Sequence, residues 1–290
     1  MFNGLEFNTK ISQFDDDHIQ IDFSSQYYKR GYIKDVQETS EEGARAFTWS
    51  SGGDQVFVDT DSQGFVIDCR SYSSAKRTKQ HVYHLARSNT WDYFCTFTFS
   101  PDQIDRSDFK LCQKKFCKFF ENLKRKFSDL KYLFIVEMHS NGEGIHFHGL
   151  IYGIPLDHLL YLGKHKCKKK LNDGRKIWSK EAYDCYSLPE YKLGYNSLSP
   201  IADQGRVCGY VCKYITKTAF VCSRLNVKGQ HLYFCSKNCR SPEVTRLCIR
   251  PEELYKWISE KYPDFQVTYS KTCESYSGNW VNYIQIERKK

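Results

Sequence analysis

The sequence lacks the signatures of several common protein classes. Its 13 cysteines include no Cys-x-x-Cys pair, which disfavours a zinc ribbon. No run of about 18 apolar residues exists, so we expect no membrane span. There is no Gly-x-x-x-x-Gly-Lys-Ser/Thr phosphate loop, so we expect no ATPase site. The cysteine count is odd and we expect no signal peptide, so reduced thiols and a cytoplasmic location are the simplest interpretation.

The charge of the chain is positive and unevenly distributed. The 43 Lys and Arg exceed the 34 Asp and Glu, giving a net charge of +9. Residues 1–90 contain 10 basic and 13 acidic residues, so the remaining 200 residues carry a net charge of +12. The densest basic patch is the run from Lys164 to Lys170, in which Lys166, Lys168, Lys169 and Lys170 are candidate nucleic-acid-binding residues. The alternative is a solvated loop.

Two β-branched and aromatic runs, 131–138 and 145–152, predict a β-hairpin. The dipeptide Asn141-Gly142 lies between them and is typical of a tight hairpin turn. If these two residues form the centre of the turn, Ser140 faces Glu143, Met138 faces Ile145, and Glu137 faces His146.

The predicted hairpin brings together three candidate metal ligands. Side chains alternate along a strand, so His146 and His148 share one face and Phe147 points to the other. Glu137 joins the histidine face, and two imidazoles with one carboxylate suit a divalent ion with open coordination positions. His139 is the reserve ligand. The alternative is that the histidines are exposed or hydrogen-bonded strand residues.

Residues 205–220 have apolar side chains at three-to-four spacing, which predicts a helix. Tyr210, Lys213, Tyr214 and Lys217 fall on one stripe of it. A phenol has a pKa near 10, and nearby ammonium groups favour the phenolate. The candidate catalytic residues are therefore the two tyrosines with the two lysines. The alternative is that both tyrosines are rim residues covering the edge of the core.

The segments His146-Phe147-His148-Gly-Leu-Ile-Tyr-Gly and Tyr210-Val-Cys-Lys-Tyr214-Ile-Thr-Lys, in this order, resemble the HUH endonuclease superfamily. Within it they resemble the two-tyrosine rolling-circle replication initiators of microviruses and related plasmids. The strand-like run 93–99 and the segments 233–238 and 241–243 resemble flanking parts of that family. Cys208 and Cys212 beside the first tyrosine depart from its pattern.

The resemblance implies metal ligands at His146, His148 and Glu137, a nucleophile pair at Tyr210 and Tyr214, and Mg²⁺ or Mn²⁺ as cofactor. It implies an enzyme that nicks single-stranded origin DNA through a 5′-phosphotyrosine link, leaves a free 3′-hydroxyl, and later rejoins the ends. A host helicase and a DNA polymerase are the inferred partners, and the location is the bacterial cytoplasm.

The fold class that we expect is α+β, an antiparallel sheet flanked by helices around the ferredoxin-like core that the family implies. We expect an N-terminal extension at 1–90, a nuclease core at 91–243 with a basic, irregular insertion near 163–199, and a C-terminal helix and strand addition at 244–290. Further helices are expected at 108–127 and 251–262, a helical start near 156–162, and strands near 231–235, 265–269 and 280–286.

Other interpretations of the two motifs must be considered. In relaxases the tyrosine precedes the histidines, single-tyrosine transposases are shorter, and a histidine-triad hydrolase needs a third alternating histidine where Leu150 stands. The alternative to an enzyme is a non-catalytic ferredoxin-like protein that binds single-stranded nucleic acid through stacking aromatic side chains.

Overall fold

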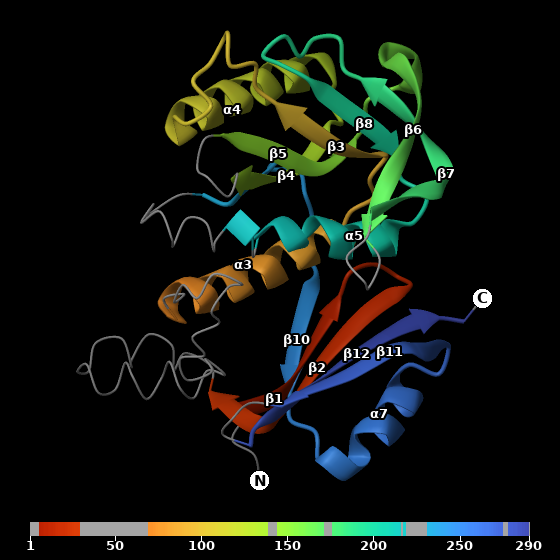
Figure 1. Ribbon diagram of the computed structural model, residues 1–290. Coiled ribbons are helices and arrows are strands. Elements are labelled where there is room, and N and C mark those ends of the chain that lie inside the picture. Colours follow the sequence, from red (N-terminus) through yellow and green to blue (C-terminus); the bar gives the residue numbers. More distant parts are fainter. Residues whose placement is uncertain are drawn as a thin grey trace. The chain divides into compact units, whose positions relative to one another are not determined.

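The computed structural model describes residues 6–29, 69–138, 144–170, 176–215, 217–218, 231–274 and 278–289. The chain divides into two compact units (Figure 1). The central unit spans Arg70–Arg240, and the terminal unit combines Met1–Cys69 with Ser241–Lys290. None of the helices within these described residues is long and apolar enough to cross a membrane.

The central unit is built on a seven-stranded antiparallel sheet with the strand order β6-β7-β8-β3-β5-β4-β9. The strands are β3 (Tyr93–Thr98), β4 (Lys131–Met138), β5 (Ile145–Tyr152), β6 (Leu160–Lys170), β7 (Lys176–Ser187), β8 (Asn196–Pro200) and β9 (Tyr233–Cys235). The terminal unit contains the second antiparallel sheet of the chain. The structure is therefore α+β and consistent with a ferredoxin-like core that carries additions, which confirms the expected fold class.

One face of this sheet is covered by helix α4 (Phe109–Lys126). The helix begins where the Asp108 carboxylate accepts a hydrogen bond from the Leu111 N–H, an N-cap that satisfies one of the free first-turn amides. Its apolar stripe packs on the strands, and the Phe116 ring stacks on Phe147 at 3.9 Å between centroids. The predicted helix at 108–127 is therefore confirmed.

The opposite face of the sheet is only partly covered. Helices α3 (Cys69–Arg87) and α5 (Gln204–Val211) pack over its apolar end, where Leu133, Leu150 and Val211 are fully buried. Because α3 belongs to this core, the central unit begins at Arg70, upstream of the boundary at 91 that we expected. The uncovered end of the same face carries the candidate functional residues.

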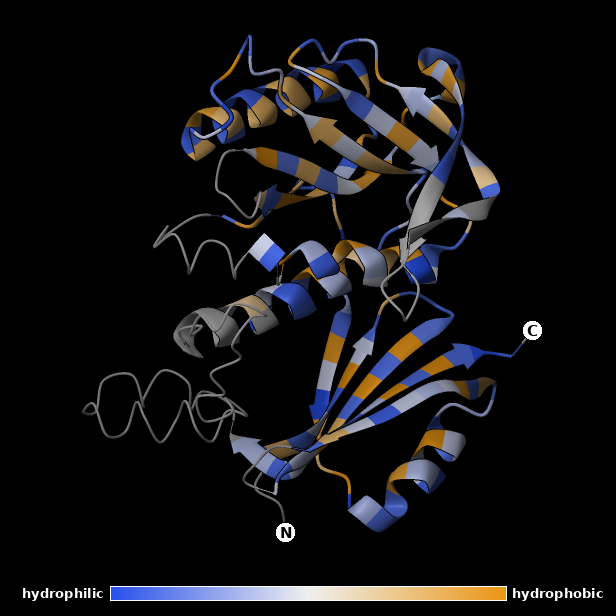
Figure 2. Ribbon diagram, in the orientation of Figure 1, coloured by the Kyte–Doolittle hydropathy of each residue, from blue (hydrophilic) through white to orange (hydrophobic). Residues whose placement is uncertain are grey.

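The terminal unit joins the two ends of the chain in one five-stranded antiparallel sheet, ordered β10-β1-β2-β12-β11. Its strands are β1 (Glu6–Gln13), β2 (His18–Lys29), β10 (Glu243–Leu247), β11 (Phe265–Glu274) and β12 (Trp280–Arg288), with η2 (Pro251–Glu253) and α7 (Leu254–Lys261) between β10 and β11. Hydrophilic and hydrophobic residues alternate along these strands (Figure 2), as expected for a sheet with one buried face. This pairing was not expected, because the sequence predicted an N-terminal extension and a separate C-terminal addition.

Three local predictions differ from the structure. The segment 163–199 is not irregular, because most of it forms the ribbon β6–β7 and the start of β8. The helical start near 156–162 is limited to the 3₁₀ turn η1 (Leu156–His158) before β6 begins. The helix expected at 205–220 ends at Val211 with Cys212 as its C-cap, and helical turns resume at 213–215 and 217–218.

Candidate active site

The candidate site lies on the face of the central sheet opposite to α4, where polar side chains replace apolar ones. Strand pairing aligns Glu137 of β4 with His146 of β5 and Thr98 of β3 in one row. The next row holds His148 and Thr96, and the row after it is apolar and covered by helices. The predicted hairpin register is confirmed at Glu137 and at Met138. Ser140, Glu143 and the reserve ligand His139 lie outside the described residues.

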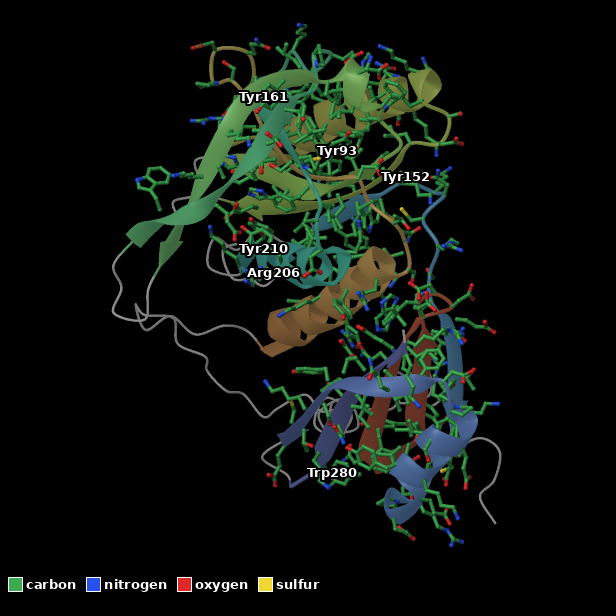
Figure 3. The ribbon with its side chains drawn as sticks, turned by 90° about the vertical axis from the view of Figure 1, so that its right-hand side faces the viewer. Tyr93, Tyr152, Tyr161, Arg206, Tyr210 and Trp280 are labelled. Atoms are coloured by element: carbon green, nitrogen blue, oxygen red, sulfur yellow. The ribbon has the colours of Figure 1, made fainter. Side chains whose placement is uncertain are left out.

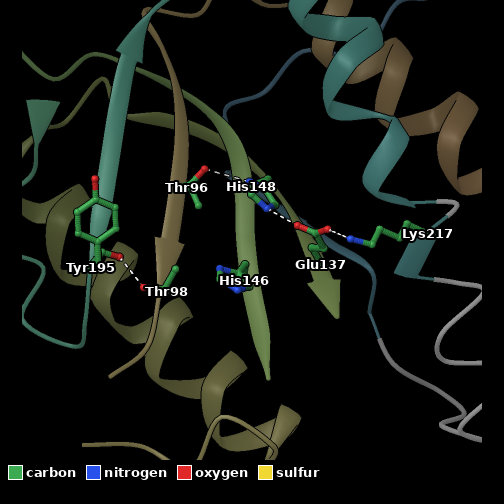
Figure 4. A pocket seen from close by; sticks show the side chains of 7 residues that line it. All are labelled: Thr96, Thr98, Glu137, His146, His148, Tyr195 and Lys217. Carbon is green, nitrogen blue, oxygen red and sulfur yellow. Dashed lines mark hydrogen bonds and ion pairs between the residues drawn. The ribbon is translucent and has the colours of Figure 1, made fainter. Parts of the chain in front are cut away.

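A chain of hydrogen bonds connects these polar residues (Figure 4). His148 Nδ1 lies 3.0 Å from the Thr96 hydroxyl, and His148 Nε2 lies 2.5 Å from Oε2 of Glu137. The other Glu137 oxygen, Oε1, accepts a hydrogen bond from the Lys217 ammonium. Glu137 therefore contacts His148, one row away from His146, which is its partner in the strand register.

The charge of Glu137 is held by this network. Burial raises the pKa of the carboxyl, but the hydrogen bonds and charges of His148 and Lys217 outweigh it and lower the pKa to about 2. The side chains of Glu137 and His148 are only 15% and 12% exposed. A carboxylate in this position needs a positive partner, because an unpaired buried charge is costly.

The two tyrosines of the predicted stripe lie against the histidine strand. Tyr214 stacks on His148 with ring centroids 4.1 Å apart and an interplanar angle of 11°. Its hydroxyl donates a hydrogen bond of 3.0 Å to the Tyr210 hydroxyl, and the two rings meet edge to face. Tyr210 lies on α5 (Figure 3) and is 43% exposed. The four-residue spacing thus brings Tyr214 onto His148 and Tyr210 next to Tyr214, although the helix is interrupted between them.

The two lysines of the stripe have different partners. The Lys213 ammonium lies 5.1 Å from the centroid of the Tyr210 ring, whereas Lys217 pairs with Glu137. Burial, the hydrogen bond to Tyr210 and the Glu137 charge raise the pKa of Tyr214 well above its usual value. The expectation that the lysines favour the phenolate therefore does not hold for Tyr214 in this structure.

Thr218 anchors the tyrosine segment to the sheet and was not singled out in the sequence. Its side chain is fully buried; its hydroxyl donates to the Val136 carbonyl at 2.5 Å and accepts from the Met138 N–H at 3.3 Å. These two backbone groups flank Glu137 on β4. The register of the segment carrying Tyr214 and Lys217 is thus fixed next to the carboxylate.

A pocket of about 370 Å³ opens over this face (Figure 4). The described residues that line it are Thr96, Thr98, Glu137, His146, His148, Tyr195 and Lys217. The threonines and Tyr195 were missed in the sequence, because they come from β3 and the start of β8, whose register with β5 no local motif fixes. The alternating threonines in the run Thr96-Phe97-Thr98 were the only available signal.

The side chains at the pocket include groups that can bind a divalent cation. Two imidazoles and a carboxylate are suitable ligands, and a hydroxyl such as that of Thr96 beside Nδ1 is the kind of partner that orients a ligating histidine. Yet no three His, Cys, Asp or Glu side chains of the described ranges stand in a metal-binding arrangement. Glu137 and His148 are bonded to each other. The residue types therefore suit a divalent cation, whereas the arrangement of the described side chains does not form a metal site.

The predicted DNA-binding lysines lie on the ribbon β6–β7, which forms one edge of the sheet (Figure 3). Lys166 is exposed, and Lys168, Lys169 and Lys170 continue along β6, where Lys168 pairs in register with Trp178 of β7. Trp178 is 60% exposed. The described lining of the pocket includes no residue of this ribbon, and Lys166 is therefore not one of the pocket residues.

Cys208 and Cys212, which depart from the family pattern, are packing residues. Both are buried with Val211 and Ile215 between α5 and the sheet. Burial raises the pKa of each thiol to about 12, so neither is a reactive thiolate at neutral pH.

Comparison with known proteins gives one family. Residues 92–219 match the family model described as replication-associated protein ORF2. The matched segment contains the whole site, from Thr96 to Thr218. No curated protein and no solved structure matches the chain. The match supports the interpretation of this chain as a replication-associated protein of the rolling-circle initiator type.

Proposed function

We propose that this protein nicks single-stranded origin DNA by tyrosine attack and rejoins the ends, as a two-tyrosine initiator of the HUH type. The family match supports replication initiation in general, and the observation that carries the finer proposal is the stack of Tyr214 on His148. Tyr214 is also hydrogen-bonded to Tyr210, and His148 lines the pocket together with His146 and Glu137. Neither Tyr210 nor Tyr214 is among the described residues that line it.

The reaction is a transesterification. A tyrosine oxygen attacks the phosphorus of the scissile phosphodiester and loses its proton, and the bond from phosphorus to the 3′ oxygen breaks. The products are a 5′-phosphotyrosine and a DNA strand with a free 3′-hydroxyl, which can prime a DNA polymerase. The reverse attack by a 3′-hydroxyl restores the phosphodiester, and the second tyrosine allows a second cleavage while the first bond persists. The reaction consumes no ATP and supplies no energy for separating DNA strands. A host helicase would therefore separate them.

His146, His148 and Glu137 are the residues that would hold Mg²⁺ or Mn²⁺. When bound, such a cation supplies Lewis-acid polarisation of the phosphate oxygens. Thr96 orients His148 through Nδ1, and Thr218 keeps the tyrosine segment against β4. Lys213, at the face of the Tyr210 ring, would contribute positive charge next to an attacking Tyr210 oxygen.

The test is adduct formation with single-stranded oligonucleotides tiled across the replicon that encodes the chain, in Mn²⁺. We expect a protein–DNA band that resists SDS and that disappears in the double variant Tyr210→Phe, Tyr214→Phe. Tyr269→Phe, an exposed tyrosine of the terminal unit, is the matched control and should keep the band. A band that persists in the double variant would contradict the proposal.

Metal dependence gives the second arm of the test. We expect EDTA and His148→Ala each to abolish the adduct while leaving salt-sensitive DNA binding largely intact. A non-catalytic binding protein, the alternative function, would bind DNA equally well in EDTA and give no adduct under any condition.

A further inference from the structure

Tyr195 is an exposed aromatic residue in the pocket that the proposed reaction does not use. It is 55% exposed, although nearby aromatic residues such as Phe97 and Tyr191 are buried in the core. Of the described residues that line the pocket, it is the only tyrosine. Single exposed aromatic side chains are common on protein surfaces, so exposure alone would assign it no role.

The backbone that carries this ring is tightly held. The Tyr195 carbonyl accepts hydrogen bonds from the Thr98 N–H at 2.8 Å and from the Thr98 hydroxyl at 3.1 Å. A Cβ at Gly194 would lie 2.3 Å from the Thr98 carbonyl oxygen, so only glycine allows this close approach. On the other side, the buried Asn196 amide bonds to both backbone groups of Leu188. The backbone on both sides of the exposed Tyr195 ring is therefore held in place by hydrogen bonds and close packing.

The orientation of the side chain favours use of the ring over use of the hydroxyl. Tyr195 stands directly before β8, next to Asn196. Figure 4 shows the hydroxyl directed along β8, away from His146 and His148. Tyr195 lines the pocket, but its hydroxyl points away from the two imidazoles, so the ring is the part of the side chain that is available to a ligand there.

We infer that Tyr195 is a stacking platform for one unpaired nucleobase of the DNA strand that enters the pocket; this inference rests on the proposed function. Every base has a π-face, and stacking on a rigid aromatic ring is the usual way in which proteins hold single strands. In a duplex the bases stack on each other, so the platform selects unpaired DNA.

The test measures DNA binding in EDTA by fluorescence anisotropy, so that it does not depend on cleavage. From the typical strength of base–aromatic stacking, we expect Tyr195→Ala to weaken binding about 5- to 150-fold, and Tyr195→Phe to bind like the unchanged protein. Tyr269→Ala in the terminal unit is the control for loss of an exposed tyrosine.

An abasic scan identifies the contact. We expect one abasic position to weaken binding to the unchanged protein and to have no further effect on Tyr195→Ala, because both changes remove the same stack. Unchanged binding by Tyr195→Ala, or equal loss in the Phe and Ala variants, would overturn the inference. Failure of the nicking proposal alone would leave the binding result in place.

Discussion

The substitution Thr218→Val tests whether one buried hydroxyl fixes the tyrosine segment. Valine has nearly the same shape as threonine, so the change leaves no cavity and removes only the hydroxyl. The Val136 carbonyl and the Met138 N–H then lose their partner in a fully buried position. Each unsatisfied backbone group costs roughly 1–3 kcal/mol, and the longer bond to Met138 falls at the low end. The expected cost is therefore about 2–4 kcal/mol.

Hydrogen exchange is the suitable assay, because a chain with two units need not unfold in a single step. We expect protection of the Met138 amide to fall about 30-fold or more, since about 1.4 kcal/mol corresponds to a factor of ten. The melting temperature of the central unit should fall by roughly 4 to 16 °C. Adduct formation should also slow, because Tyr214 and Lys217 lie in the same short segment.

Thr218→Ser retains the hydroxyl and serves as the control. It should preserve the protection of the Met138 amide and most of the adduct yield. If the Met138 amide is protected from exchange equally in Thr218→Val and in the unchanged protein, the hydroxyl does not anchor the segment. The tyrosines would then be positioned by other contacts.

Two further predictions address the ribbon and the cysteines. Lys164 and Lys166 are exposed on β6, so replacing both with Ala should weaken DNA binding. The slope of the logarithm of the binding constant against the logarithm of the salt concentration should fall in magnitude by about 0.7 for each lysine that contacts a phosphate of a single strand. Titrations at several salt concentrations measure this slope. An unchanged salt dependence would assign the ribbon no phosphate contact. Iodoacetamide at pH 8 should label the exposed Cys273 well before the buried Cys208 and Cys212, and equal labelling by mass spectrometry would show that the thiols of α5 are accessible.

The sequence was sufficient for features that depend on neighbouring residues. The hairpin register of Glu137 and His146 follows from an Asn-Gly dipeptide between two strand-like runs, and the Tyr210–Tyr214 pair follows from a four-residue spacing. The helix that begins at Phe109 follows from a cap and an apolar stripe. In each case the interactions that decide the geometry lie between residues close together in the chain.

The missed features depend on pairing between distant segments. Thr98 faces His146 across a connection that contains all of α4, and Tyr195 reaches the same row only after the ribbon β6–β7. The terminal sheet pairs β2 with β12 from opposite ends of the chain. A register between strands so far apart is set by packing of whole elements, and a one-residue shift would reverse every side chain. No local signal in the sequence determines it.

The two lysines of the tyrosine stripe show the same limit for electrostatics. Helical spacing placed Lys213 and Lys217 equally close to the phenols, and so predicted that both favour the phenolate. The structure separates them, because Glu137 lies within reach of Lys217. A carboxylate offers an ammonium a full negative charge, whereas a neutral phenol offers only a dipole, so the ammonium prefers the carboxylate. Lys217 therefore keeps Glu137 ionised in the pocket, and only Lys213 remains at the ring of Tyr210. The position of one carboxylate on the neighbouring strand, rather than the spacing of the helix, decides which lysine accompanies a tyrosine.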